Sequence, residues 1–362
     1  MPSPEGHLTL RLYLYADSRV QVEVISSRPQ LADRLFQDKT PDEAAELAGR
    51  VFTLCGRAQR LAAAAACAAA QSSHSSLSRK ENTTDWRSWQ QAVLIETALE
   101  HAWRLLVDWP TQAGLPPDMN SLRELRQAAS AGPVALADVL DAVRERASLA
   151  GPLPYSHKRE RASSTNTTLS SKTTSSIPAE ESWDGGLLPP ISTLNPTEVD
   201  ALAWRALEEP AFCARPVWRG QPAETGALAR QQHCPLLANL LAGSKCRVHA
   251  RWLARCMELA ELPNRLRREP NDLLLAQSLA KNHGYAWVET ARGALLHVVR
   301  LKQGRVAAYR IIAPTEWNFH PAGPFVAGIA ALSETSDLAT AARALALSLD
   351  PCVSYQVELV DA

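Results

Sequence analysis

The sequence has 362 residues, enough to bury a sizeable core in one large domain or two ordinary ones, which excludes a small disulfide- or metal-stapled scaffold. Lys plus Arg and Asp plus Glu each number 38, so the net charge is zero and the positive footprint of a nucleic-acid-binding protein is missing. The longest run of small or apolar residues, Leu61 to Ala70, is too short to span a bilayer, and the first residues carry no secretory signal. We therefore expect a cytoplasmic protein without nucleic-acid or membrane partners.

The N-terminal part of the chain predicts a β-hairpin followed by helices. Apolar residues alternate over Leu8–Leu14 and again over Val20–Val24, as in two paired strands. Thr40 is placed as the N-cap of a helix with a capping box. After a break at Cys55-Gly56, eight of the ten residues from Leu61 to Ala70 are alanine, which predicts a buried helix.

Two further helices are expected before a polar insert. The first covers Trp86 to Trp109 and is stopped by Pro110, and the second covers Leu122 to Leu149. Residues 159–179 are rich in Ser and Thr and cannot bury enough apolar surface to order, so we expect a disordered insert. It divides one domain into an N-terminal half, 1–158, and a C-terminal half, 180–362.

The C-terminal half predicts helices, a hairpin and a final helix. The helices are expected at 196–207, 227–241 and 246–262, and the final one at 336–349. The hairpin pairs Ala294–Leu301 with Arg305–Ala313 around a turn that contains Gly304. The expected fold is of the α+β class, mostly helical, with small antiparallel hairpins near both ends.

Two of the seven scattered cysteines are candidate ligands for a soft metal. Asp350 and Pro351 are suited to begin a helix, which would place Cys352 in its first turn, where a thiolate is stabilised. Cys55 precedes the Ala-rich helix, and Gly56 would let a ligand approach the backbone. The alternative is that each cysteine is a small buried hydrophobic residue.

A second group of unusual residues surrounds the C-terminal hairpin. Arg292 precedes it, and Pro314 and Thr315 follow it, so a guanidinium and a hydroxyl could donate to an anionic ligand. The alternative is a solvated arginine and an ordinary turn at a strand end.

Other kinds of site have weaker support. Cys246 and His249, with Cys234 and Cys256 nearby in the sequence, could hold zinc, but they also fit an ordinary packed helix face, and no CxxC occurs. No nucleophile elbow and no phosphate-binding glycine loop is present, which argues against hydrolase and nucleotide-dependent activities.

Four segments together resemble the large subunit of nickel–iron hydrogenases, and they frame nearly the whole chain. They occur in that family's order: Glu5-Gly6-His7-Leu8, Cys55-Gly56, the block from Ala291-Arg292-Gly293 to Pro314-Thr315-Glu316-Trp317-Asn318, and Asp350-Pro351-Cys352. With Cys55-Gly56-Arg57-Ala58-Gln59 and Asp108-Trp109-Pro110, the chain is similar to the HupK/HoxV type of hydrogenase accessory protein.

The resemblance implies a site for iron without nickel. In the hydrogenases each metal-binding end carries a CxxC pair, but the second cysteine of each pair is replaced here by Ala58 and Tyr355, so no stable nickel is expected. Cys55 and Cys352 match the first cysteines. Arg292 and Thr315, with Pro314, match the residues beside the iron-bound cyanides.

The function implied by the resemblance is that of a non-catalytic scaffold in hydrogenase maturation. It would transiently hold an iron–cyanide–carbonyl unit, with maturation factors and the immature large subunit as partners. The alternative is a structural subunit of a larger redox complex without a metal site. The scaffold function requires that Cys55 and Cys352 lie close together.

Overall fold

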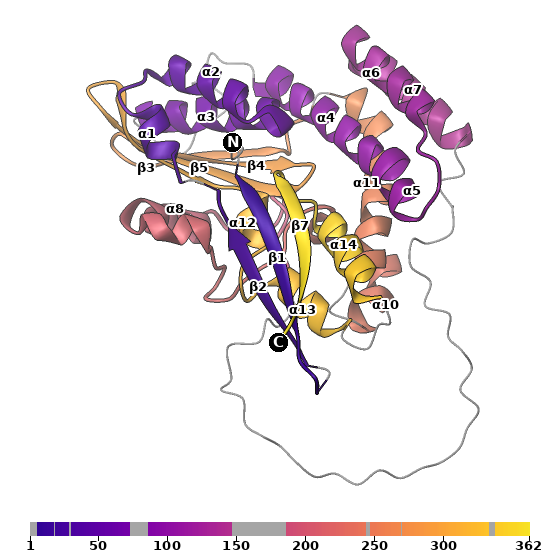
Figure 1. Ribbon diagram of the computed structural model, residues 1–362. Coiled ribbons are helices and arrows are strands. Elements are labelled where there is room, and N and C mark those ends of the chain that lie inside the picture. Colours follow the sequence, from indigo (N-terminus) through magenta and orange to yellow (C-terminus); the bar gives the residue numbers. More distant parts are fainter. Residues whose placement is uncertain are drawn as a thin grey trace, which may run out of the picture.

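The computed structural model describes residues 6–17, 19–28, 30–72, 86–146, 186–243, 247–268, 270–332 and 337–362. The predicted insert at 159–179 lies outside the described residues. Figure 1 shows the arrangement of helices around two sheets, one of three strands and one of four. The prediction of a mostly helical α+β fold is confirmed.

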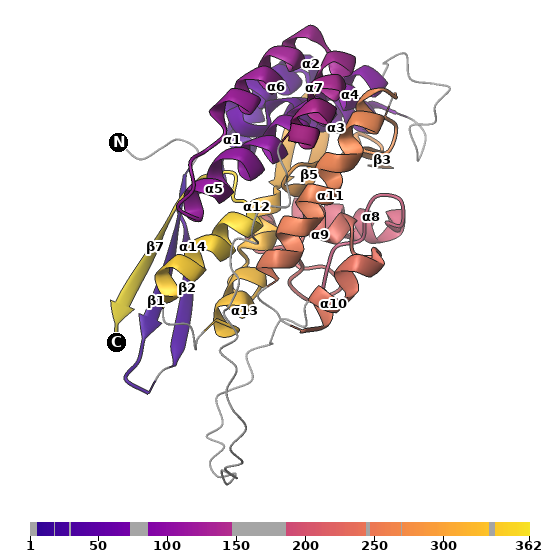
Figure 2. The same ribbon diagram turned by 90° about the vertical axis from the view of Figure 1, so that its right-hand side faces the viewer.

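The three-stranded sheet joins the two ends of the chain. Strands β1 (His7–Leu14) and β2 (Val20–Ser26) form the predicted hairpin, and β7 (Ser354–Asp361) pairs with β1 in parallel. The buried leucines of β1 pack into the main core, and Figure 2 shows α13 (Pro324–Ala330) and α14 (Leu338–Leu349) beside this sheet. The predicted antiparallel hairpins near both ends are confirmed, whereas the parallel pairing of β7 with β1 was not expected from the sequence.

The four-stranded sheet is an antiparallel meander that contains the second predicted hairpin. Its strands are β3 (Leu274–Ala280), β4 (His283–Thr290), β5 (Gly293–Lys302) and β6 (Arg305–Ile312). Strands β3 and β4 were not expected from the sequence. Nearly every residue of β4 is buried, because its two faces pack against two separate core clusters, so the alternation that marks a half-exposed strand is missing.

One face of this sheet is covered by the alanine-rich helix. The first helices are α1 (Ala32–Phe36), α2 (Pro41–Val51), η1 (Thr53–Cys55) and α3 (Gly56–Gln71). The predicted capping box at Thr40 is confirmed. The alanines of α3 pack against Ala286, Val299 and Tyr309 of the sheet, as Figure 1 shows for the elements concerned, so the predicted burial of this helix is also confirmed.

The next two predicted helices are more broken than expected. Helix α4 (Trp86–Trp103) runs through a π-helical segment, η2 (Arg104–Asp108), into α5 (Trp109–Gln112), so Pro110 lies within the first turn of α5 rather than ending the helix. The second is two helices, α6 (Met119–Ala131) and α7 (Pro133–Arg146). Gly132 separates them because its φ of 125° is open to glycine alone.

The remaining helices lie below the four-stranded sheet and beside it. They are α8 (Pro196–Glu208), η3 (Pro210–Ala214), α9 (Ala227–Arg230), α10 (Pro235–Gly243), α11 (Val248–Leu266) and α12 (Pro314–Asn318). The single helix expected at 227–241 is interrupted before Pro235, because the residue preceding a proline is disfavoured in a helix. Within the described residues, no helix is both long and apolar enough to cross a membrane.

Candidate functional site

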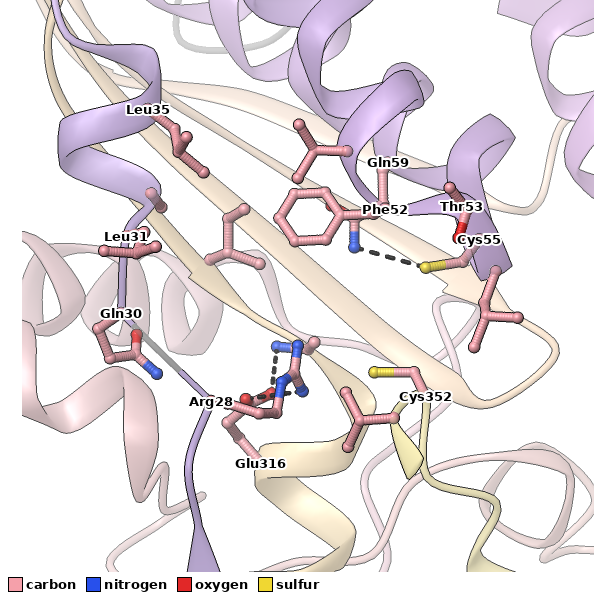
Figure 3. Close-up of a pocket in the computed structure, with 16 residues that line it drawn as sticks. Arg28, Gln30, Leu31, Leu35, Phe52, Thr53, Cys55, Gln59, Glu316 and Cys352 are labelled. Carbon is pink, nitrogen blue, oxygen red and sulfur yellow. Dashed lines mark hydrogen bonds and ion pairs between the residues drawn. The ribbon is translucent and has the colours of Figure 1, made fainter. Parts of the chain in front are cut away.

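A pocket of about 490 Å³ lies between the segment that leads into α3 and the segment that leads into β7. Figure 3 shows that the sulfur atoms of Cys55 and Cys352 both point into it, from opposite walls. The rest of the lining is mostly apolar, from Leu31, Leu35, Val51, Phe52, Leu54, Ile311 and Val353. The two cysteines predicted as ligands therefore meet in one pocket, as the sequence argument requires.

Cys55 is the residue from which α3 begins. It occupies the N-cap position, and its sulfur accepts a hydrogen bond from Nε2 of Gln59, one turn further along the helix, at 3.6 Å. Burial raises the pKa of the Cys55 thiol to about 12, and the neighbouring groups Cys352 and Glu96 act in the same direction. A bound metal cation would oppose this effect, because it favours the thiolate.

The helix N-terminus beside Cys55 is occupied by a carboxylate. Glu96 accepts hydrogen bonds from the backbone N–H groups of Arg57 (2.9 Å) and Ala58 (3.2 Å). Its burial raises its pKa to about 7, although these hydrogen bonds favour the charged form. Gly56 serves helix packing rather than the approach of a ligand, which corrects the prediction: a Cβ there would lie 2.6 Å from the carbonyl oxygen of Gly49 in α2.

Cys352 does not begin a helix. Asp350 ends α14 with a left-handed φ of 56°, and the chain passes through Pro351 and Cys352 into strand β7. The prediction that Cys352 lies in the first turn of a helix is therefore wrong. Cys352 is instead held by the Thr315 hydroxyl, which donates to Sγ of Cys352 at 3.0 Å and accepts from the backbone N–H of Cys352 at 3.1 Å.

Arg292 lies behind the thiols and does not line the pocket itself. Its guanidinium pairs with Glu100 at 2.6 Å and Asp350 at 3.3 Å. Burial works to lower the pKa of Arg292, but the charges of Asp350 and Glu100 outweigh it and raise the pKa above its usual value. Arg292 lowers the pKa of the Cys55 thiol against the effect of burial. The predicted residues Pro314 and Thr315 are buried in the first turn of α12 and are also absent from the lining of the pocket.

A second buried guanidinium, that of Arg28, was not predicted from the sequence. Arg28 follows β2 and lines the pocket, where it forms an ion pair of 2.8 Å with Glu316 (Figure 3). Burial works to lower the pKa of Arg28, but its ionisable neighbours Cys352, Glu316 and Cys55 outweigh it and raise the pKa above its usual value. An isolated arginine between a strand and a proline gives no signal in the sequence. Only the fold shows that it faces the thiols.

Among the described residues that line the pocket, Cys55 and Cys352 are the only cysteines. Ala58 is fully buried in α3, and Tyr355 lies in β7 and packs against the main core. In the part of the chain that the structure describes, no three His, Cys, Asp or Glu side chains form a ligand set. The alternative zinc site includes Cys246, which lies outside the described residues. Glu5, from the first segment of the hydrogenase resemblance, also lies outside them.

Comparison with known proteins places the chain beside hydrogenase accessory proteins. It is 31% identical to the hydrogenase expression/formation protein HupK of Rhizobium leguminosarum bv. viciae, over 94% of this chain and 93% of that protein. Identity to the hydrogenase expression/formation protein HoxV of Cupriavidus necator is 30%, over 93% of each chain. Residues 245–354 match the family model described as nickel-dependent hydrogenase.

The fold is similar to that of hydrogenase large subunits. Superposition on the Ni-Fe-Se hydrogenase from D. vulgaris Hildenborough, in the as-isolated oxidized state, gives a TM-score of 0.54 at 14% identity. It covers 92% of this chain and 93% of that one. At this identity the similarity concerns the fold alone, and it confirms the fold that the sequence resemblance implied.

Proposed function

Because the chain belongs to the family of hydrogenase expression/formation proteins of the HupK and HoxV type, we propose that it is a non-catalytic scaffold in hydrogenase maturation. Its cargo is an iron unit that carries cyanide and carbonyl ligands. Cys55 and Cys352 hold the iron, and the completed unit passes to the immature large subunit.

The observation that carries this proposal is the meeting of two thiols, from segments far apart in the sequence, in one pocket flanked by buried guanidiniums. Thiolates suit a soft, electron-rich iron centre. Cyanide nitrogen atoms carry partial negative charge, and the guanidiniums of Arg28 and Arg292 lie close enough to interact electrostatically with the thiol pair. An anionic complex is therefore favoured over a bare cation.

The same site explains why the cargo could be released. The side chains at Ala58 and Tyr355 supply no bridging thiolate, so a second metal has no bridge to the iron. Two thiolates also hold iron less firmly than four. A destination with a full set of cysteines would therefore receive the unit from this site.

Infrared spectroscopy with iron and nickel analysis tests the proposal. The protein is purified without oxygen from a host that carries the maturation machinery, together with the variants Cys55→Ala and Cys352→Ala. We expect cyanide and carbonyl bands and iron without nickel in the unmodified protein, and loss of both the bands and the iron in each variant. Cys256→Ala is the matched control, because this half-buried cysteine packs in the main core and is not part of the pocket lining.

A structural role in a larger complex is the second candidate. It predicts a protein without iron in all four samples and a stable, stoichiometric complex with another subunit. Absence of bands and iron from the unmodified protein, in a host whose own hydrogenase is active, would contradict the scaffold proposal.

A further inference from the structure

We propose that Gln59 is a positioning residue for Cys55 and that His297 and Tyr309 hold its amide so that an N–H group always faces the sulfur. The inference rests on the proposed role of Cys55 as an iron ligand. It assigns to three buried residues a task that neither the sequence motifs nor the pocket lining alone indicates.

The four side chains form an unbroken chain of hydrogen bonds. Gln59 Nε2 lies 3.6 Å from Cys55 Sγ, Gln59 Oε1 lies 2.9 Å from His297 Nε2, and His297 Nδ1 lies 2.7 Å from the Tyr309 hydroxyl. The residues come from α3, β5 and β6. Gln59 is 2% exposed, and His297 and Tyr309 are fully buried, so water does not compete for these bonds.

The direction of every bond in the chain follows from chemistry. Burial holds the pKa of His297 down to about 3, so the ring is neutral and has one N–H group. The Gln59 oxygen can only accept, which places that hydrogen on Nε2. Nδ1 must then accept from the Tyr309 hydroxyl. Because the Gln59 oxygen accepts from His297, the NH₂ group of the Gln59 amide faces Cys55.

The far end of the chain is held by packing. The ring of Tyr309 stacks on that of Phe36, with ring centres 4.1 Å apart, and its backbone N–H donates to Asp33 at 2.7 Å. Burial raises the pKa of the Tyr309 hydroxyl, so it keeps its proton and remains a donor. A flip of the Gln59 amide would force His297 into its other tautomer, with the hydrogen on Nδ1. The Tyr309 hydroxyl would then lose the acceptor for its hydrogen, which is costly in a dry core.

Both cysteine sulfurs therefore accept donated hydrogen bonds. An amide N–H of Gln59 donates to Cys55, whereas Cys352 accepts from the Thr315 hydroxyl and is also hydrogen-bonded by Arg28. Such bonds orient the sulfur lone pairs and withdraw electron density from a metal-bound thiolate. We infer that these donors are part of how the site binds iron and yet can release it.

Two substitutions, each with a matched control, test this inference in the metal-free protein. Tyr309→Phe removes only the hydroxyl that fixes the histidine tautomer. Tyr285→Phe makes the same change in another fully buried tyrosine of the same sheet. Gln59→Met removes the amide, and Gln90→Met does so at a buried glutamine in α4 whose oxygen accepts from Leu273 N–H.

The first readout is cadmium affinity, from the thiolate-to-cadmium absorption. Loss of an outer hydrogen-bond partner costs about 10- to 100-fold in metal affinity, so we expect a loss of that size for Gln59→Met and a smaller loss for Tyr309→Phe. The second readout is the alkylation rate of Cys55 relative to Cys352, from peptide mass spectrometry. It is expected to fall in the same two variants. Neither quantity should change in the controls, even if their stability falls.

Equal behaviour of Tyr309→Phe and Tyr285→Phe in both readouts would overturn the inference. The outcome is separable from that of the proposed function. Cadmium affinity and alkylation follow Gln59 whether or not an iron unit is ever loaded, whereas the cyanide and carbonyl bands test the iron unit itself. In protein that carries iron, Gln59→Met should also move the carbonyl band to lower wavenumber, because the sulfur then donates more electron density.

Discussion

Thr315 illustrates how one hydroxyl can serve both the fold and the site. It lies in the first turn of α12 and binds the backbone N–H and the sulfur of the same cysteine, Cys352. The resemblance to hydrogenases implies a role for this hydroxyl beside a cyanide. In the structure, the hydroxyl's own hydrogen is given to the thiol.

Replacing Thr315 with Val should leave the backbone N–H of Cys352 without its acceptor. Loss of a partner to a buried donor costs about 1–3 kcal/mol, so we expect the free energy of unfolding to fall by that amount in urea denaturation. Thr315→Ser keeps the hydroxyl and should retain most of the stability. A serine variant as unstable as the valine variant would show that packing of the methyl group, rather than the hydrogen bonds, matters here.

His320 makes the stability of the protein depend on pH. Burial, with a smaller effect of Arg215, holds its pKa down to about 4, and its Nδ1 accepts from the backbone N–H of Ala322 at 3.1 Å. The unfolded chain binds a proton at this histidine below about pH 6.5. Between pH 6.5 and 4 the unfolded state therefore binds more protons than the folded state, and stability falls as the pH falls.

His320→Asn should remove this dependence while keeping an acceptor for Ala322. We expect the unfolding free energy of the unmodified protein, relative to the variant, to fall as the pH is lowered from 6.5 to 4. The slope should be below about 1.4 kcal/mol per pH unit, because the ring is partly exposed to solvent. A difference that is the same at pH 7.5 and pH 5 would contradict this account.

The residues of the site differ in how far sequence could reveal them. Short segments with recognisable chemistry contain the two cysteines, Arg292 and Thr315. The two cysteines line one pocket, and Arg292 and Thr315 interact with them. Arg28, Gln59, His297 and Tyr309 are ordinary polar residues in their segments. Their importance depends on which side chains meet across α3, the sheet and the end of β2, and no local pattern encodes such meetings.

At the scale of elements, α3 packs very closely against the four-stranded sheet. A Cβ on Gly284 in β4 would lie 2.4 Å from the backbone nitrogen of Ala70. Alanines on the helix and glycine on the strand let the two backbones approach closely. This approach helps to place the N-terminus of α3, and with it Cys55, against the sheet.

Gly284→Ala should therefore destabilise the protein strongly. The added methyl group meets backbone atoms that cannot move aside, and overpacking of this kind costs about 3 kcal/mol or more. Gly304→Ala is the control, because its Cβ would meet nothing within 4 Å and only its left-handed φ of 76° is unfavourable, at about 1 kcal/mol. Urea denaturation of both variants measures the difference, and equal losses would argue against the contact.

Sequence patterns predicted the elements that alternation, capping residues or a turn glycine mark, and they missed the first two strands of the four-stranded sheet. The N-terminal hairpin, the capped helix α2 and the β5–β6 hairpin were expected, because alternation or capping residues mark them. Strand β4 is buried on both faces, and its sequence shows no alternation. The Asp350-Pro351 pair predicts the start of a helix, but the segment leads into β7. The alternating Tyr355, Val357 and Leu359 fit a strand that pairs with β1.

At the scale of the whole molecule, Asp350 connects elements from distant parts of the chain. Its carboxylate is 1% exposed and pairs with Arg104 at 2.7 Å, Arg292 at 3.3 Å and Arg255 at 3.5 Å. Burial works to raise the pKa of Asp350, but these guanidiniums outweigh it and hold the pKa well below its usual range. The pairs tie η2, α11 and the β4–β5 turn to the segment that carries Cys352.

Asp350→Asn should remove the charge and keep the backbone, since asparagine also tolerates the left-handed conformation. Removing one partner of a buried ion pair costs about 3–5 kcal/mol, and three guanidiniums lose their shared carboxylate here. Asp337→Asn, at the N-cap of α14, should have almost no effect, because asparagine caps as well as aspartate. An Asp350→Asn variant as stable as this control in urea denaturation would mean that the arginines find other partners.

The parallel pairing of β1 with β7 has a consequence for when the thiol pocket comes into existence. Cys55 follows the first hairpin, whereas Cys352 is positioned by a strand that can pair with β1 only after all the intervening elements have been synthesised. A nascent chain, or one cut short anywhere between the two cysteines, has only half of the pocket. Both sulfur atoms therefore line the pocket only in a chain that has been synthesised and folded as far as β7.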